Sequence, residues 1–236
     1  MRCNINIMIV CLIFFSSCTK LISIQSFESE TIEVKNDIDS LIYKMIIPYQ
    51  TEIDKQMDQN LCYTKNDLLK GKPESTLGNF ICDLSLETSN KQADVCVMNY
   101  GGLRSTISAG NITKRDIFKV MPFENELVIL ELDKLEFYQM LEYLTKRGGE
   151  PFSGMEINQK NDTILYSINN KDLLKEKYIR VLTTDYLANG GDKMSFFKNK
   201  KQNQLGIKLR DAIITYCTSK DTININLDKR ISLNEK

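Results

Sequence analysis

The chain has 236 residues, with 31 basic and 31 acidic side chains and no histidine. Its length suits one large domain or two small ones, and 42% hydrophobic with 26% charged residues is an ordinary globular composition. The zero net charge argues against a nucleic-acid binder, and the lack of histidine excludes Ser-His-Asp and Cys-His nucleophiles and imidazole-ligated metal sites.

The first residues have the pattern of an export signal. Arg2 precedes an unbroken apolar run from Ile7 to Phe15, which is too short to span a bilayer, and two serines lie directly before Cys18. This predicts a signal peptide over 1–17, a bacterial lipobox with Cys18 as the lipid-attachment site, and a tether over 18–30. We therefore expect an exported lipoprotein that is anchored to a membrane, either in the periplasm or at the cell surface. An ordinary signal peptide cut nearby, with the cysteine incidental, is the alternative.

The first half of the mature chain shows clear helical periodicity and one buried strand. Apolar residues spaced three or four apart predict an amphipathic helix over 36–57, and a second helix is expected after Ser75. The apolar run 94–98 predicts a strand that ends in a glycine turn. Thr113 is a candidate N-cap for a short helix at 114–120.

The second half mixes strands and helices without regular βαβ alternation. The expected elements are a strand at 126–132, a helix at 135–146, strands at 154–158, 163–168 and 178–184, a helix at 207–218 and a closing strand at 228–233. The three neighbouring strands suggest an antiparallel meander. The helix at 135–146 is expected to bury Leu135, Tyr138, Leu141 and either Tyr143 or Leu144. We therefore expect one α+β domain over 31–236, with antiparallel strands and flanking helices.

Four cysteines, at 62, 82, 96 and 217, lie beyond the N-terminal signal pattern. No C-x-x-C pair occurs among them, so neither a zinc ribbon nor a redox dithiol is indicated. Cys82 and Cys96 lie within apolar patterns and are expected to be buried thiols. A disulfide is possible in an exported protein, but its pairing cannot be read from the sequence.

Two glycine-rich segments follow predicted strands and are the best places for ligand chemistry. The segment 99–104 (NYGGLR) joins paired glycines, which let a backbone approach a ligand closely, to Arg104, which can grip a phosphate or a diol. The segment 184–192 (TDYLANGGD) offers Tyr186 for stacking on a base and Asp192 as an acceptor for two ribose hydroxyls. Each segment taken alone is also compatible with a plain tight turn.

Six short motifs occur in order along the chain: ESTLGN at 74–79, NYGGLR at 99–104, GNIT at 110–113, PFEN at 122–125, SG at 153–154 and NGGD at 189–192. Each is weak alone, and Phe123 in the fourth is by itself more often a core residue than a stacking platform. Together they make the chain resemble the C-terminal, nucleoside-recognising domain of the 5′-nucleotidase family, over roughly residues 35–236.

The resemblance implies a set of substrate-binding roles. In the family two aromatic rings sandwich the base, an asparagine contacts the base edge, an aspartate binds the ribose hydroxyls, and an arginine with a glycine close by contacts ribose or phosphate. The matching positions are Phe123, Tyr186, Asn99, Asp192, Arg104 and Gly102. Tyr186 replaces the more usual phenylalanine. The family's further arginine before the ESTLGN motif is also missing, so that either a lysine of Lys70-Gly71-Lys72-Pro73 substitutes for it or the contact is lost.

The family's two-metal phosphoesterase domain normally precedes this domain and uses histidine ligands. The chain has no histidine and leaves no room for that domain upstream of residue 30, so neither a catalytic residue nor a metal cofactor is expected here. The resemblance therefore implies the recognition half of a split 5′-nucleotidase. A separate metallophosphoesterase chain would supply divalent metals for phosphate-ester hydrolysis. The alternatives are a non-catalytic nucleoside- or nucleotide-binding surface lipoprotein, and a remnant that keeps the motifs only as turns and core.

Overall fold

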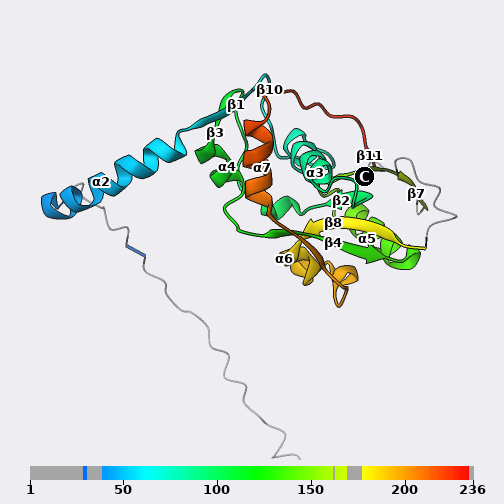
Figure 1. The fold of residues 1–236 in the computed structure, drawn as a ribbon. Helices are drawn as coiled ribbons and strands as arrows, with labels where there is room; N and C mark the ends of the chain where they lie inside the picture. The colour runs from blue at the N-terminus through cyan, green and yellow to red at the C-terminus, as the bar shows by residue number, and fades with distance from the viewer. Residues whose placement is uncertain (1–28, 31–38, 162, 169–176, 234–236) are drawn as a thin grey trace, which may run out of the picture. The chain divides into compact units, whose positions relative to one another are not determined.

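The computed structural model describes residues 29–30, 39–161, 163–168 and 177–233 (Figure 1). The predicted signal peptide, Cys18 and all but two residues of the predicted tether lie outside this part of the chain. The chain divides into two units with the boundary between residues 44 and 45. All three sheets belong to the second unit. Within the described residues, the structure contains no helix that is both long and apolar enough to cross a bilayer.

Helix α2 (Ser40–Met57) confirms the predicted helix, apart from positions 36–38, which lie outside the described residues. Its apolar side chains are exposed: Met45 is 71% exposed, Tyr49 74% and Ile53 54%. The amphipathic pattern thus predicted the helix correctly, but its apolar stripe is not part of the hydrophobic core of the described residues.

The main sheet has five strands in the order β5-β2-β8-β4-β9. Their bounds are Phe152–Ser153 (β5), Val95–Val97 (β2), Ile179–Thr184 (β8), Glu126–Leu132 (β4) and Asn203–Lys208 (β9). Strand β2 runs parallel to β8, and the other neighbours are antiparallel. The six-residue register of β4 on β8 runs from Leu127 opposite Thr184 to Leu132 opposite Ile179.

The domain also contains two three-stranded sheets, with strand orders β10-β1-β3 and β11-β6-β7. Their bounds are Asn60–Thr64 (β1), Gly110–Thr113 (β3), Thr222–Ile223 (β10), Met155–Lys160 (β6), Thr163–Ile168 (β7) and Ile231–Ser232 (β11). Strands β6 and β7 pair antiparallel as predicted, but the expected third strand of that meander, β8, is a central strand of the five-stranded sheet. Its nearly continuous burial explains the difference, because an apolar run without alternation suits a strand covered on both faces.

The remaining helices are α3 (Thr76–Thr88), α4 (Lys114–Val120), α5 (Lys134–Lys146), α6 (Asp185–Ala188) and α7 (Leu209–Thr218). The predicted N-cap Thr113 is confirmed, because its hydroxyl accepts from the amide of Asp116 while the Asp116 carboxylate accepts from the Thr113 amide. The mixed α/β fold with helices around the sheets confirms the expected α+β class, although each of the three sheets also contains one parallel pair.

The main sheet separates two hydrophobic clusters. Helices α3, α4 and α7 contribute to one cluster and α5 to the other, and strand β2 sends Cys96 to the first and Val95 and Val97 to the second. The predicted inner face of α5 was partly wrong: Leu141 is buried and so is Leu144, one of the two alternatives for the last position, but Leu135 and Tyr138 are exposed. The buried stripe is Phe137, Met140, Leu141 and Leu144, an equally good helical spacing that contact with the sheet selects.

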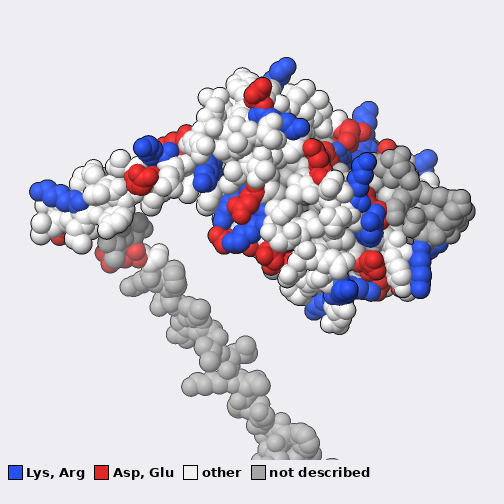
Figure 2. Space-filling model, viewed as in Figure 1, with Lys and Arg blue, Asp and Glu red and all other residues white. Residues whose placement is uncertain are grey.

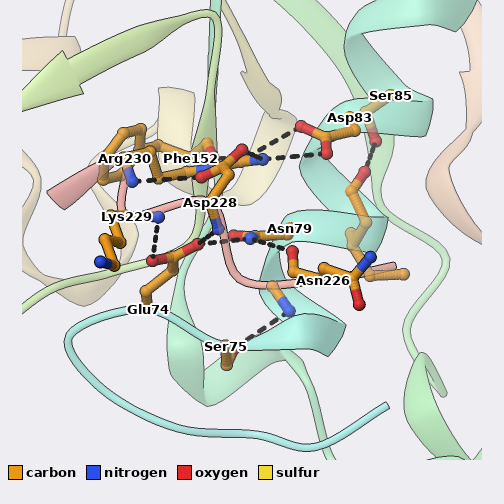
Figure 3. A network of polar contacts seen from close by, with 12 residues as sticks. Glu74, Ser75, Asn79, Asp83, Ser85, Phe152, Asn226, Asp228, Lys229 and Arg230 are labelled. Atoms are coloured by element: carbon orange, nitrogen blue, oxygen red, sulfur yellow. Dashed lines mark hydrogen bonds and ion pairs between the residues drawn. The ribbon is translucent and has the colours of Figure 1, made fainter. Parts of the chain in front are cut away.

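A polar network fastens the C-terminal segment to α3 (Figure 3). The Glu74 carboxylate accepts hydrogen bonds from the Asn79 side chain (2.6 Å) and from the amides of Asp228 (2.9 Å) and Lys229 (3.1 Å). The Arg230 guanidinium pairs with Asp83 at 2.8 and 3.0 Å and donates to the Phe152 carbonyl at 2.8 Å. The network directly precedes β11, which pairs with β6.

We expect Arg230→Met to lower the free energy of unfolding by about 2–4 kcal/mol. The Arg230 side chain is only 10% exposed. Its loss would leave the Phe152 carbonyl and the Asp83 carboxylate without this donor. Urea unfolding followed by circular dichroism measures the change. Lys229→Met is the control, because Lys229 joins the network through its backbone amide, which the substitution keeps, and only the neighbouring side-chain charge is removed. An equal loss in that control would contradict the assignment.

Candidate functional site

All six predicted site residues lie around one pocket of about 330 Å³. Its lining residues are Asn99, Gly101, Gly102, Arg104, Phe123, Asn125, Tyr186 and Asp192. Gly101 and Asn125 were not among the predicted site residues. A hollow of about 300 Å³ over β6 and β7 has none of these glycine turns, so we take the first pocket as the candidate site.

Strand direction explains why three distant segments meet at this pocket. The segment 99–104 follows β2, and the segment 185–192 follows its parallel neighbour β8, so both leave the same edge of the sheet. Strand β4 is antiparallel to β8, and therefore the residues that precede it, including Phe123 and Asn125, lie at that edge too. The hydroxyl of Thr183 donates to the Val97 carbonyl (2.8 Å) and ties the ends of β8 and β2 together.

The Asp192 carboxylate is held in place by two neutral donors. One oxygen accepts from the Asn99 side-chain amide (2.5 Å) and the other from the Tyr186 hydroxyl (3.1 Å). The Asp192 backbone has a left-handed φ of 50°, and its carbonyl accepts from the Tyr143 hydroxyl at 2.7 Å. A carboxylate has about four acceptor positions, so each oxygen can still accept from a ligand hydroxyl.

The two aromatic side chains of the pocket are surface residues. Phe123 is 44% exposed and Tyr186 is 47% exposed, so Phe123 is not the core residue that its apolar character alone would favour. A Cβ at Gly191 would lie 2.5 Å from ring carbons of Tyr186, so only glycine lets the ring lie against the backbone. The Arg104 guanidinium carbon lies 5.9 Å from the centre of the Phe123 ring. Flat ring faces and a guanidinium thus border the same opening.

Arg210 holds the loop that carries Phe123, and sequence reasoning missed it. Its guanidinium donates to the Pro122 carbonyl (3.0 Å) and to Glu124 (2.7 Å) and lies 4.2 Å from the ring centre of Phe118. The pKa of Glu124 is lowered by hydrogen bonds from Lys208 and from Arg210. An arginine in the first turn of a predicted helix gives no sequence signal of this role, since its partners lie more than eighty residues earlier.

The turn at Tyr100 is supported from behind by Glu150, whose side chain is only 1% exposed. This carboxylate accepts from the Tyr100 amide (2.5 Å), from Lys72 (3.1 Å) and from Arg147 (3.3 Å). Lys72 is therefore engaged in supporting the turn, whereas the Lys70 ammonium lies 4.3 Å from the centre of the Tyr100 ring. Neither lysine lines the pocket.

Comparison with known proteins agrees with the fold and with the motifs. The family model for the 5′-nucleotidase C-terminal domain matches residues 62–199, more than half of the chain. A 5′-nucleotidase of Vibrio parahaemolyticus is 28% identical over 182 residues, and an apyrase of Tabanus yao is 26% identical over 192 residues. These alignments cover 70% and 68% of this chain but only 31% and 35% of the relatives.

Solved structures show the same fold. The 5′-nucleotidase precursor of Thermus thermophilus superimposes with a TM-score of 0.71 at 23% identity, covering 83% of this chain and 44% of that one. The NAD nucleotidase of Haemophilus influenzae gives a TM-score of 0.64 at 19% identity, covering 84% of this chain and 42% of that one. The chain belongs to the family of 5′-nucleotidase C-terminal domains. It spans about a third of the length of the curated relatives it matches.

We expect Arg210→Met to loosen the Phe123 loop. Loss of the guanidinium leaves the Pro122 carbonyl without that donor, so amide hydrogen exchange in a peptide spanning 118–126 should speed up by roughly tenfold. Lys208→Met is the matched control, because it removes only the more exposed partner of Glu124. Equal exchange rates in the Arg210 variant and the unsubstituted protein would contradict this role.

Proposed function

We propose that this chain is the nucleotide-recognising part of a 5′-nucleotidase and that its pocket binds the nucleoside. The observation that carries the proposal is the meeting of two exposed aromatic rings with a fixed carboxylate at one opening. Rings stack on any base, and a carboxylate with free acceptor positions suits the vicinal hydroxyls of ribose. Family membership supports the same ligand class.

In this arrangement the base lies between Phe123 and Tyr186, and the ribose hydroxyls donate to Asp192. Asn99 contributes to the base edge while its amide also steadies the carboxylate. Arg104 is exposed and bonds only weakly to the Gly101 carbonyl (3.3 Å), which leaves its guanidinium available for ribose or phosphate. Gly102 keeps the backbone close, because a Cβ there would lie 2.6 Å from the Asn99 side-chain oxygen.

The proposal assigns hydrolysis to a second chain. A metallophosphoesterase protein would supply two divalent metals and the attacking water, while this chain holds base and ribose. The lack of histidine in this sequence motivates this division. Export and lipid anchoring through Cys18 are part of the proposal and rest on the N-terminal pattern alone.

Nucleoside binding is testable by calorimetry with adenosine. Phe123→Ala should weaken binding by roughly 5- to 150-fold, because stacking on one ring is worth about 1–3 kcal/mol. Tyr178→Ala is the matched control, since that tyrosine is 41% exposed, close to the 44% of Phe123, and does not line the pocket. Absence of binding to the unsubstituted protein at millimolar adenosine would leave only the remnant interpretation.

The role of Asp192 predicts a specific pattern of sugar preference. Adenosine should bind roughly 10- to 150-fold more tightly than 2′,3′-dideoxyadenosine, which lacks both hydroxyls, because hydrogen bonds to a charged acceptor are worth about 1.5–3 kcal/mol. Asp192→Asn should abolish most of that preference while it preserves stacking. If the preference survives in the variant, the aspartate is not the ribose ligand.

The split-enzyme proposal is tested by reconstitution. The purified full chain is mixed with a metallophosphoesterase chain from the same organism, and phosphate release from AMP is measured with Mn²⁺ or Zn²⁺ present. We expect the mixture to exceed the partner alone and the Phe123→Ala mixture to lose most of that gain. Adenosine binding with no gain in activity would instead favour the non-catalytic nucleotide-binding lipoprotein.

A further inference from the structure

The four cysteines of the described residues form two close pairs, and the two members of each pair come from different secondary-structure elements. Cys62 of β1 lies beside Cys217 of α7, and Cys82 of α3 lies beside Cys96 of β2. All four are buried and are free thiols in this structure. The burial predicted for Cys82 and Cys96 is thus confirmed.

The backbone brings Cys62 and Cys217 together independently of their side chains. Helix α7 ends one residue after Cys217, and a tight turn leads from it into β10. Strand β10 pairs with β1 so that Thr222 lies opposite Tyr63, the residue next to Cys62. Both thiols also belong to the same hydrophobic cluster. Their neighbourhood therefore rests on strand register and core packing.

The two thiols of this pair are chemically unequal. A hydrogen bond from Cys217 lowers the pKa of Cys62, while the same contact and burial raise the pKa of Cys217. Cys62 is 4% exposed and Cys217 is fully buried. The attacking species in disulfide exchange is the thiolate, so Cys62 is the thiol suited to react first with an external oxidant.

We propose that Cys62 and Cys217 form a disulfide bond when the folded protein meets a small-molecule or protein disulfide donor in an oxidising compartment. The Cys62 thiolate attacks the donor disulfide, forms a mixed disulfide and releases one donor thiolate. The Cys217 thiolate then attacks the Cys62 sulfur and releases the second donor thiolate. The two protons leave the cysteines, and the two electrons reduce the donor to two thiols. Oxidising conditions are required, as in an exported protein.

This bond would fix the C-terminal end of α7 to β1. The N-terminal end of the same helix carries Arg210, which holds the loop of Phe123. The bond would also join residues near the two ends of the main domain into one covalent loop, which restricts the unfolded chain. The disulfide is therefore a stabilising link behind the pocket, and it does not depend on the ligand that the pocket binds.

The test is oxidation of the purified, reduced and folded full chain in a glutathione redox buffer. After alkylation of remaining thiols and proteolysis, mass spectrometry should find a linked pair of peptides containing Cys62 and Cys217, lighter by two hydrogen atoms than the free peptides. The thermal unfolding midpoint of the oxidised protein should fall by roughly 5–15 °C when reductant is added.

Two double variants separate this pair from the other. Cys82→Ala/Cys96→Ala should keep both the linked peptides and the response to reductant, whereas Cys62→Ala/Cys217→Ala should lose the response. Recovery of Cys62 and Cys217 as alkylated, unlinked peptides after oxidation overturns the proposal. A bond from Cys62 to any cysteine other than Cys217 overturns it as well. Peptide mapping of the unsubstituted protein gives this answer even if a variant does not fold.

Discussion

The pairing of β8 with β4 on one side and β2 on the other is the constraint on which the pocket depends. It brings together the residues after β2, the residues after β8 and the residues before β4 at one edge of the sheet. None of these segments holds a pocket alone, because each is a short turn with exposed side chains. A slip of one residue in this register would turn the side chains of β4 to the opposite face and change where its preceding loop begins.

Neutral hydrogen bonds organise the ligand-facing groups, and ion pairs support them from behind. Asp192 is held by an amide and a hydroxyl, which orient the carboxylate without neutralising it. Arg210 and Glu150, both largely buried, brace the Phe123 loop and the Tyr100 turn through charged hydrogen bonds. The Asp192 carboxylate therefore keeps its charge at the pocket opening. The buried charges of Arg210 and Glu150, whose desolvation is unfavourable, are each paired by hydrogen bonds within the protein. The balanced charge fits this design, and on the face in Figure 2 basic and acidic side chains are interspersed.

Local signals predicted most helices and the longer strands, since caps and periodicity act within a few residues. The Thr113 cap and the strand 126–132 were confirmed at their expected positions. Predictions that depended on a distant partner were weaker. The inner face of α5 was partly misplaced because two helical stripes have acceptable spacing, and β8 was assigned to the wrong neighbour because a run of apolar residues does not specify which strands flank it. Short strands such as β1 and β10 offered too few residues for any periodicity.

The sequence by itself determined the family, because six motifs in order carry information that no single turn holds, and it identified six of the eight residues that line the pocket. Only the tertiary structure decided that Phe123 is exposed, that Asn125 shares its pocket and that Arg210 holds its loop. It also resolved which cysteines are neighbours. The physical reason is common to all of these: motif chemistry is local in the chain, whereas burial, hydrogen-bond partners and thiol proximity are set by strand order and helix packing between residues far apart in sequence.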